Sequence, residues 1–387
     1  MSKKLFGVDL DIFLLGLVSF FNDVSSEMIF SVFSVFFTVI LGASAFLFGI
    51  LEGLADLAST SLDYISGFIS DKTGKRKKYA FMGYSLSAIG KAIILFSSTI
   101  SAAFSFRVID RLGKSIRGSP RDAWLSSIAK KSNKGLSFGI HQTLDQAGAV
   151  VGPLLAYLIL SHFGQSFDSF SLLFKLAFIP AIIGLGILLL IKDKPITPKK
   201  KEKFFGSYKG FSKELKHYIS TAGIFSLAYF SFGFLLLKAY LVGFAIKDVI
   251  LIYTLFNVSA LIFSIPLGKI GDSFGRKKII MLSYIIYFIL SVGFIVASTK
   301  LFVIFLFVLF GLFYAIDESQ TKAYISDLER QRRATAIGVY NFITGLIYLF
   351  ASLIAGYLWK INPNYAFIYA SIISLIAIIY FISKRRN

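Results

Sequence analysis

The sequence predicts an all-α polytopic membrane protein, and three observations carry this prediction. Of the 387 residues, 56% are hydrophobic and only 16% are charged, which is more apolar surface than a soluble domain needs. The apolar residues form runs, such as residues 172–191, of roughly the 20 residues that cross about 30 Å of hydrocarbon. These runs must be helical because lipid offers no partner to an open backbone group, and their lack of alternation excludes a transmembrane barrel.

Counting the apolar runs and the breaks between them predicts twelve transmembrane spans. The fourth span is unusual because its cytoplasmic half, residues 107–121, is rich in charge. An even number of spans places both ends of the chain on the same side of the membrane. The predicted spans are residues 11–40, 45–70, 79–98, 101–127, 136–161, 170–191, 219–245, 249–271, 279–298, 301–327, 334–358 and 364–383.

The formal net charge of +20 is concentrated at alternate ends of the spans. The hairpins near Gly42, Ser98 and Gly164 contain no Lys or Arg, whereas the connections on the opposite side are strongly basic. By the positive-inside rule, the basic side and both termini are cytoplasmic. We therefore expect a multi-pass protein of the plasma membrane, which is the inner membrane in cells that have two membranes. The charge therefore reports topology, and we expect membrane lipids but no nucleic acid as partners.

One basic segment divides the chain. Residues 192–217 carry two prolines and a run of lysines, and six predicted spans lie on either side of them. We therefore expect a cytoplasmic basic linker at 192–217 between an N-terminal six-helix bundle, residues 1–191, and a C-terminal six-helix bundle, residues 218–387.

An internal repeat supports this division. The pattern Gly-x-x-x-Asp-x-x-Gly, followed by basic residues, comes after the second span and again after the eighth, at a constant offset of 201 residues. The glycines allow close helix approach and a tight turn, and the aspartate can cap a helix or pair with a base, so we expect a latch. The two copies contain Gly67, Asp71, Gly74 and Arg76, and Gly268, Asp272, Gly275 and Arg276.

With this repeated motif the chain resembles the major facilitator superfamily, whose signature has this form and position in both halves. Gly148, Gly152 and Pro153 on the fifth span also look like the Gly-x-x-x-Gly-Pro motif of that superfamily's drug–proton antiporter group, although Leu155 and Ala156 replace its trailing glycine pair. The other interpretation is a kinked helix that packs through small residues. The resemblance implies two six-helix bundles around a central cavity and secondary transport by alternating access.

Charged side chains within the spans are costly in hydrocarbon and by default face the bundle interior or a water-filled cavity. Loss of hydration favours the protonated form of a carboxyl group, so acids near the midplane are candidates for proton coupling. The alternative is that these groups form ion pairs that hold the half-bundle together. The candidates are Asp23, Glu27, Asp56 and Asp145, with His141 as a relay.

The expected cargo cavity has a charged wall from the first half and a polar, aromatic wall from the second, which suits an amphiphilic organic solute. Arg107 and Arg111 can bind an anionic group of the cargo or keep a neighbouring acid ionised. Lys114 and Arg117 lie nearer the cytoplasm, where we expect a gate. The predicted lining residues are Asn22, Glu52, Arg107, Asp110, Arg111, Gln142, Tyr229, Asn257, Tyr314, Asp317 and Asn341.

The sequence contains no Walker A loop, nucleophile elbow, HExxH motif or cysteine, so we expect no enzyme activity, no cofactor and no metal. Transport must then draw on an ion or solute gradient. We expect a monomer that moves a small organic solute with a coupling proton, with export favoured over uptake. The alternatives are a proton-coupled or facilitative importer of a metabolite or siderophore-like compound, a lipid or lysolipid translocase, and a non-transporting membrane sensor.

Overall fold

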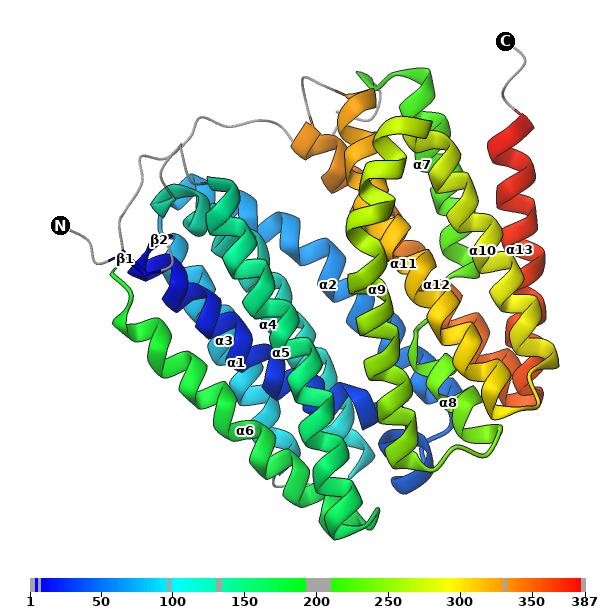
Figure 1. Cartoon of the computed structure of the whole chain (residues 1–387), viewed down its shortest axis with the longest axis horizontal. Helices are drawn as coiled ribbons and strands as arrows, with labels where there is room; N and C mark the ends of the chain where they lie inside the picture. The colour runs from blue at the N-terminus through cyan, green and yellow to red at the C-terminus, as the bar shows by residue number, and fades with distance from the viewer. Residues whose placement is uncertain are drawn as a thin grey trace. The chain divides into compact units, whose positions relative to one another are not determined.

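The computed structural model describes residues 4–5, 8–95, 99–129, 134–192, 210–329 and 333–383, and they are almost entirely helical (Figure 1). A short antiparallel pair of strands, β1 (Lys4–Leu5) and β2 (Val8–Asp9), precedes the first helix. The helices are α1 (Leu10–Val35), its π-helical continuation η1 (Phe36–Ile40), α2 (Ala45–Thr73), α3 (Arg76–Leu95), α4 (Ile100–Ile128), α5 (Lys134–Phe163), α6 (Phe167–Leu190), α7 (Lys213–Ala228), α8 (Gly233–Leu241), α9 (Ile246–Phe274), α10 (Arg276–Val296), α11 (Lys300–Leu328), α12 (Arg333–Ile361) and α13 (Pro363–Ser383). The prediction of an all-α polytopic membrane protein is confirmed.

Within the described part of the chain, ten spans are long and apolar enough to cross a membrane. The third and fourth predicted spans, α3 and α4, are not among them. α4 carries several charges along its length, including Arg107, Asp110 and Arg111, and α3 carries Lys91. These are the helices in which buried charge replaces part of the apolar surface that marks an ordinary span.

The seventh predicted span differs from a continuous helix. The chain forms α7 and α8 around a non-helical stretch at 229–232, and α7 begins at Lys213, within the residues assigned to the linker. Hydrogen bonds satisfy the interrupted backbone: the Ser231 amide donates to Ser352 Oγ at 3.3 Å, and the Gly233 amide donates to Ser231 Oγ at 3.2 Å. Non-helical backbone at membrane depth is tolerated when protein groups satisfy it in this way.

The chain separates into two compact units. The first unit contains residues 1–42 and 58–201, and the second contains residues 43–57 and 202–387. Helix α2 is therefore divided, and its first turns pack in the second unit. A Cβ atom on Gly49 would lie 2.4 Å from the Ser352 carbonyl oxygen, so glycine is what allows α2 to approach α12 there.

Both units use the same scheme of helix contacts. In the first unit, α1 packs against α5 and α6, and α3 packs against α4 and α6. In the second unit, α7 packs against α12 and α13, and α10 packs against α11 and α13 (Figure 1). Each contact thus recurs between helices that correspond across the sequence repeat, which indicates that the two units share one fold.

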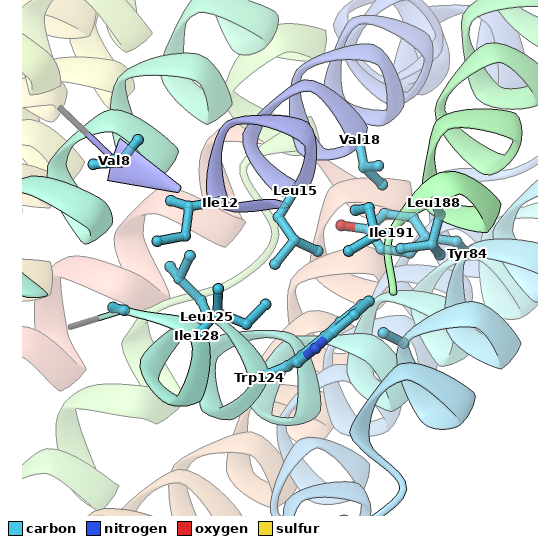
Figure 2. Close-up of a cluster of buried hydrophobic side chains, with 12 residues drawn as sticks. Val8, Ile12, Leu15, Val18, Tyr84, Trp124, Leu125, Ile128, Leu188 and Ile191 are labelled. Atoms are coloured by element: carbon cyan, nitrogen blue, oxygen red, sulfur yellow. The ribbon is translucent and has the colours of Figure 1, made fainter. Parts of the chain in front are cut away.

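The first unit has a compact apolar core near the N-terminal end of α1. Figure 2 shows Ile12 and Leu15 of α1 packed with Trp124 of α4 and Leu188 of α6. Tyr84 of α3 belongs to the same cluster and also lies under the guanidinium of Arg117, 4.7 Å from its ring centroid. The core therefore adjoins the charged residues of α4 directly and supports their position.

The core of the second unit is built largely from aromatic rings. Phe225 of α7 stacks on Tyr284 of α10 with centroids 4.0 Å apart, and Tyr218 stacks on Tyr340 at 5.9 Å. Offset or edge-to-face ring pairs contribute about 0.5–1.5 kcal/mol each beyond their buried area, so this network stabilises the contacts of α7 with α10 and α12.

Candidate functional site

A cluster of ionisable groups joins α1, α4 and α5 in the first unit. Arg121 of α4 lies 3.7 Å from the Asp145 carboxylate of α5 and donates a hydrogen bond to Ser19 Oγ at 3.0 Å. Ser19 in turn donates to Asp145. Asp23 is within hydrogen-bonding reach of Asp145, and Asn22 Nδ2 donates to Asp23 at 3.4 Å. Two of the predicted proton-coupling acids are therefore neighbours.

A second charged pair lies beside this cluster. Lys91 of α3 is fully buried, with its ammonium 4.0 Å from the Asp110 carboxylate of α4, and it donates a hydrogen bond to Ser26 Oγ of α1 at 3.0 Å. Lys91 also interacts electrostatically with Asp23 and Glu27. Asp110 was predicted as a cavity residue, but it is only 1% exposed and its neighbour is this lysine.

The arginines of α4 lie over aromatic rings of α1. The guanidinium of Arg107 is 4.3 Å from the Phe30 ring centroid, and that of Arg111 is 5.2 Å from the same ring. Arg117, six residues further along α4, donates to Ser87 Oγ at 2.7 Å. Lys114 is exposed on this helix and interacts electrostatically with Asp23 and Glu27.

Two glycines of α5 bring the acids of α1 close to that helix. A Cβ on Gly148 would lie 2.6 Å from the Phe20 carbonyl oxygen and 3.0 Å from Asp23 Cβ. A Cβ on Gly152 would lie equally close to the Val24 carbonyl oxygen and to Glu27 Cβ. The Gly-x-x-x-Gly spacing therefore positions the acid-bearing face of α1 against α5, with Pro153 following inside the helix.

The other predicted residues of α5 divide between the interior and the surface. His141 is buried, and within the described residues its Nε2 has no hydrogen-bond partner. It interacts electrostatically with Arg121 and Asp145, which places it at the edge of the acid cluster. Gln142 is exposed. These adjacent residues therefore face different surroundings, as expected for consecutive positions of a helix.

Two acids of α2 fall in the second unit, unlike Asp23 and Asp145. Glu52 is buried and accepts a hydrogen bond from Ser231 Oγ at 2.9 Å, at the interruption between α7 and α8. Asp56 interacts electrostatically with Tyr348 of α12. The acids of α2 are thus divided between the units, since Asp63 accepts from the Ser119 amide of α4 at 2.8 Å in the first unit.

Asp317 of α11 lies among the tyrosines of the second unit. Thr321 Oγ1 donates to its carboxylate at 3.3 Å and accepts from the Tyr218 hydroxyl at 3.1 Å. The carboxylate also interacts electrostatically with Tyr229 and Tyr348. Within the part of the chain that the structure describes, no basic side chain pairs with Asp317, whereas its neighbour Glu318 forms an ion pair with Lys322.

The remaining predicted lining residues of the second unit have varied surroundings. Asn257 Nδ2 donates to the Tyr253 carbonyl one turn earlier in α9, at 3.2 Å. Tyr314 is 39% exposed and Asn341 is partly exposed. Tyr229 packs edge-on against Tyr348, with centroids 5.3 Å apart. Their role in binding cargo remains a prediction.

The repeated motif makes matching contacts in both units. Gly74 and Gly275 have φ of +69° and +94°, as the tight turns require. Arg76 donates to the Ala123 carbonyl of α4 at 2.7 Å, and Arg276 pairs with Asp327 of α11 at 2.9 Å, so each arginine reaches the end of the following helix. A Cβ on Gly67 would lie 2.9 Å from Ser119 Cβ. The side chains of Asp71 and Asp272, and the surroundings of Gly268, lie outside the described part of the structure.

Three members of the charged cluster were not among the predicted site residues: Lys91, Arg121 and Ser19. A lysine inside an otherwise apolar span was the available signal for Lys91. Arg121 follows Pro120 at the charged end of the fourth span, and nothing in that local sequence indicates its contact with α5. The small hydroxyl of Ser19 carries no sequence signal, since serines are frequent in all these helices.

Comparisons with known proteins agree with this architecture. The family model of the Major Facilitator Superfamily matches residues 15–249 and 223–387. The MFS-type transporter MJ1317 of Methanocaldococcus jannaschii is 38% identical over 378 residues, 95% of this chain and 93% of that protein. Multidrug resistance protein 2 of Bacillus subtilis is 21% identical over 314 residues, 78% of each chain. The crystal structure of the nucleoside transporter NupG has a TM-score of 0.80 at 14% identity, covering 98% of this chain and 100% of that one.

These matches define the chain as a multi-pass membrane transporter that binds small-molecule substrates, and not an enzyme. It belongs to the Major Facilitator Superfamily.

Proposed function

We propose that this transporter couples the movement of a small organic solute to the movement of protons, by alternating access and in the outward direction. The observation that carries the proposal is the proximity of Asp23 and Asp145 in the first unit. Two carboxyl groups can share a hydrogen bond only while one of them holds a proton. A site that retains one proton among several charges has the chemistry that coupling requires.

The groups around Asp23 support the release and rebinding of its proton. Arg121 and Ser19 hold Asp145 as the ionised partner, so Asp23 is the group that takes the proton. When Asp23 gives up its proton, Lys114 and Lys91 offer compensating positive charge. Glu27, one turn away on α1, is acted on by the same two lysines and is the second proton carrier of the proposal.

The direction of transport is supported by the glycine contact between α5 and α1 and by the multidrug relative. Gly148, Gly152 and Pro153 occupy the place of a motif associated with export, and they hold α5 against the acid-bearing face of α1. Multidrug resistance protein 2 of Bacillus subtilis matches most of the chain. The proposed location is the plasma membrane, with both termini cytoplasmic and a monomer as the working unit.

Proton flux in proteoliposomes tests this proposal. Purified protein is reconstituted with a trapped pH dye and challenged with lipophilic cations, organic acids, amino acids, sugars and chelators. We expect one class to drive a proton flux that is abolished in Asp23→Asn and strongly reduced in Asp145→Asn. The matched control is Asp168→Asn, which removes an exposed carboxylate at the start of α6 and leaves the flux unchanged. Transport at the wild-type rate in Asp23→Asn and Asp145→Asn would remove the proposed coupling role of these acids.

A further inference from the structure

The basic side chains of α4 are not equally neutralised. Arg121 pairs with Asp145 at 3.7 Å, and Lys91 of α3 pairs with Asp110 at 4.0 Å. Lys114 acts on Asp23 and Glu27. Each of these acids therefore acts on a base other than Arg111.

Arg111 differs from these bases in its surroundings. Among the residues described, no carboxylate lies within 4.0 Å of its guanidinium, and its buried Nε has no hydrogen-bond partner. The neighbouring positive charge of Lys114 acts on it directly. A guanidinium keeps its positive charge in proteins, so this repulsion is not relieved by loss of a proton. A positive charge held in this way attracts an external anion.

Phe30 of α1 orients this guanidinium for such a ligand. The ring centroid lies 5.2 Å from Arg111 Cζ and 4.3 Å from Arg107 Cζ, so one ring supports two cations by cation–π attraction. Stacking engages the flat face of a guanidinium and leaves its N–H donors along the edge. Nε and one Nη nitrogen form the edge that binds a carboxylate or phosphate side-on with two parallel hydrogen bonds.

From these contacts we propose that Arg111 is the anchor for an oxyanion, a carboxylate or phosphate group, on the transported solute. Phe30 is the positioning residue that holds the guanidinium, and Arg107 adds positive charge beside it. The inference rests on the proposed function in one respect only, namely that the anion bound here is part of the cargo. It narrows the cargo from any small organic solute to an organic anion or a zwitterion.

Equilibrium binding tests the proposal without transport. Full-length protein in lipid nanodiscs is titrated by calorimetry with benzoate, phenyl phosphate and benzyltrimethylammonium, three small aromatic probes that differ in the charge of the head group. We expect one of the anions to bind at least about tenfold tighter than the cation. Comparison of benzoate with phenyl phosphate identifies which oxyanion the site prefers.

Variants of Arg111 and Phe30 distinguish the effect of the positive charge on anion binding from the effect of the guanidinium's orientation. Arg111→Gln is expected to weaken anion binding by at least about tenfold, and Arg111→Lys by less, because a lysine keeps the charge but loses the side-on edge. Phe30→Leu keeps both arginines and is expected to give an intermediate loss. Lys175→Gln, which removes an exposed base of α6 in the same unit, should bind like the wild type.

The proposal is overturned by any of three results: no anion binding to the wild-type protein, equal or tighter binding of the cation, or unchanged anion affinity in Arg111→Gln. The outcome is independent of proton coupling, which is read from flux in Asp23→Asn. Anion binding lost in Arg111→Gln while flux persists in Asp23→Asn would retain the oxyanion site and remove the proposed coupling. The reverse pattern would remove the oxyanion site alone.

Discussion

The two units share a scheme of helix contacts but differ in what their helices bury. In the first unit, α3 and α4 bury Lys91, Asp110 and Arg107, and charges are matched across helices at 3.7 and 4.0 Å. In the second unit, the corresponding helices bury tyrosines and phenylalanines, and among the described residues no base lies at ion-pair distance from Asp317, although Lys322 interacts with it electrostatically. One backbone arrangement thus supports two different interiors, so the fold does not require the buried charges.

This difference favours a functional interpretation of the charges in the first unit. Buried ion pairs are weak contributors to stability, and aromatic packing in the second unit shows that the same contacts can be made without them. The first unit places acids and bases where the second unit has aromatic rings, and proton and solute binding explain this better than stability does. The bases are Lys91, Arg107, Arg111, Lys114, Arg117 and Arg121. Variants at related sites in the two units test this interpretation.

The largest effect is expected at the helix contact beside Asp23 and Glu27. Replacing both Gly148 and Gly152 by Ala places methyl groups within 2.6 Å of backbone oxygens of α1, so the helices must separate. We expect the free energy of unfolding to fall by about 3 kcal/mol or more, measured by thermal unfolding in detergent.

The matched contact in the second unit is that of α7 with α12, where Gly223 of α7 faces α12. A Cβ there would lie 3.1 Å from Ile347 Cδ1, the end of a flexible side chain that can move. Gly223→Ala should therefore change stability by less than about 1 kcal/mol, because helix propensity offsets the crowding. Equal losses in the two units would show that the glycine contact of the first unit has no special role.

A smaller effect is expected for the ion pair between α4 and α5. Asp145→Asn removes the carboxylate of α5 from Arg121 and leaves it only the exposed Asp122 of its own helix, 3.0 Å away. Because the side chains of Asp145 and Arg121 are 24% and 18% exposed, we expect a loss of about 1–2 kcal/mol. The double variant with Arg121→Gln should lose less than the sum of the single variants, giving a coupling energy of about 0.5–3 kcal/mol in a double-mutant cycle. Additive losses would indicate that the pair does not interact in the folded protein.

The smallest effect is expected for the acid of the second unit. Asp317→Asn keeps a hydrogen-bond acceptor for Thr321 and removes a charge among rings, so stability should stay equal or rise by up to about 1 kcal/mol. Glu318→Gln breaks an exposed pair with Lys322 and should change stability by less than about 0.5 kcal/mol. A clear loss in Asp317→Asn, beyond that of Glu318→Gln, would reveal a charged partner and weaken the contrast between the units.

Local patterns were sufficient for the broad architecture of the fold. Apolar runs predicted the spans, and the repeated glycine–aspartate motif predicted two related halves, because hydropathy and tight turns depend on residues adjacent in the chain. The interruption between α7 and α8 was not predictable in this way. It contains neither Pro nor a turn-forming pair, and it is stabilised by Ser352 and Glu52, which are distant in sequence.

In the candidate site, too, contacts between residues distant in sequence could not be predicted. The amino-acid sequence was enough to predict that acids and bases lie within the spans of the first half, since each is visible as a charge in an apolar run. The folded arrangement was needed to see that Arg121 pairs with Asp145 and that Lys91 pairs with Asp110. It was also needed to see that Arg111 lies over Phe30, with no carboxylate at ion-pair distance among the residues that the structure describes. The physical reason is that helix rotation and crossing, set here by close glycine contacts, determine which side chains meet across helices.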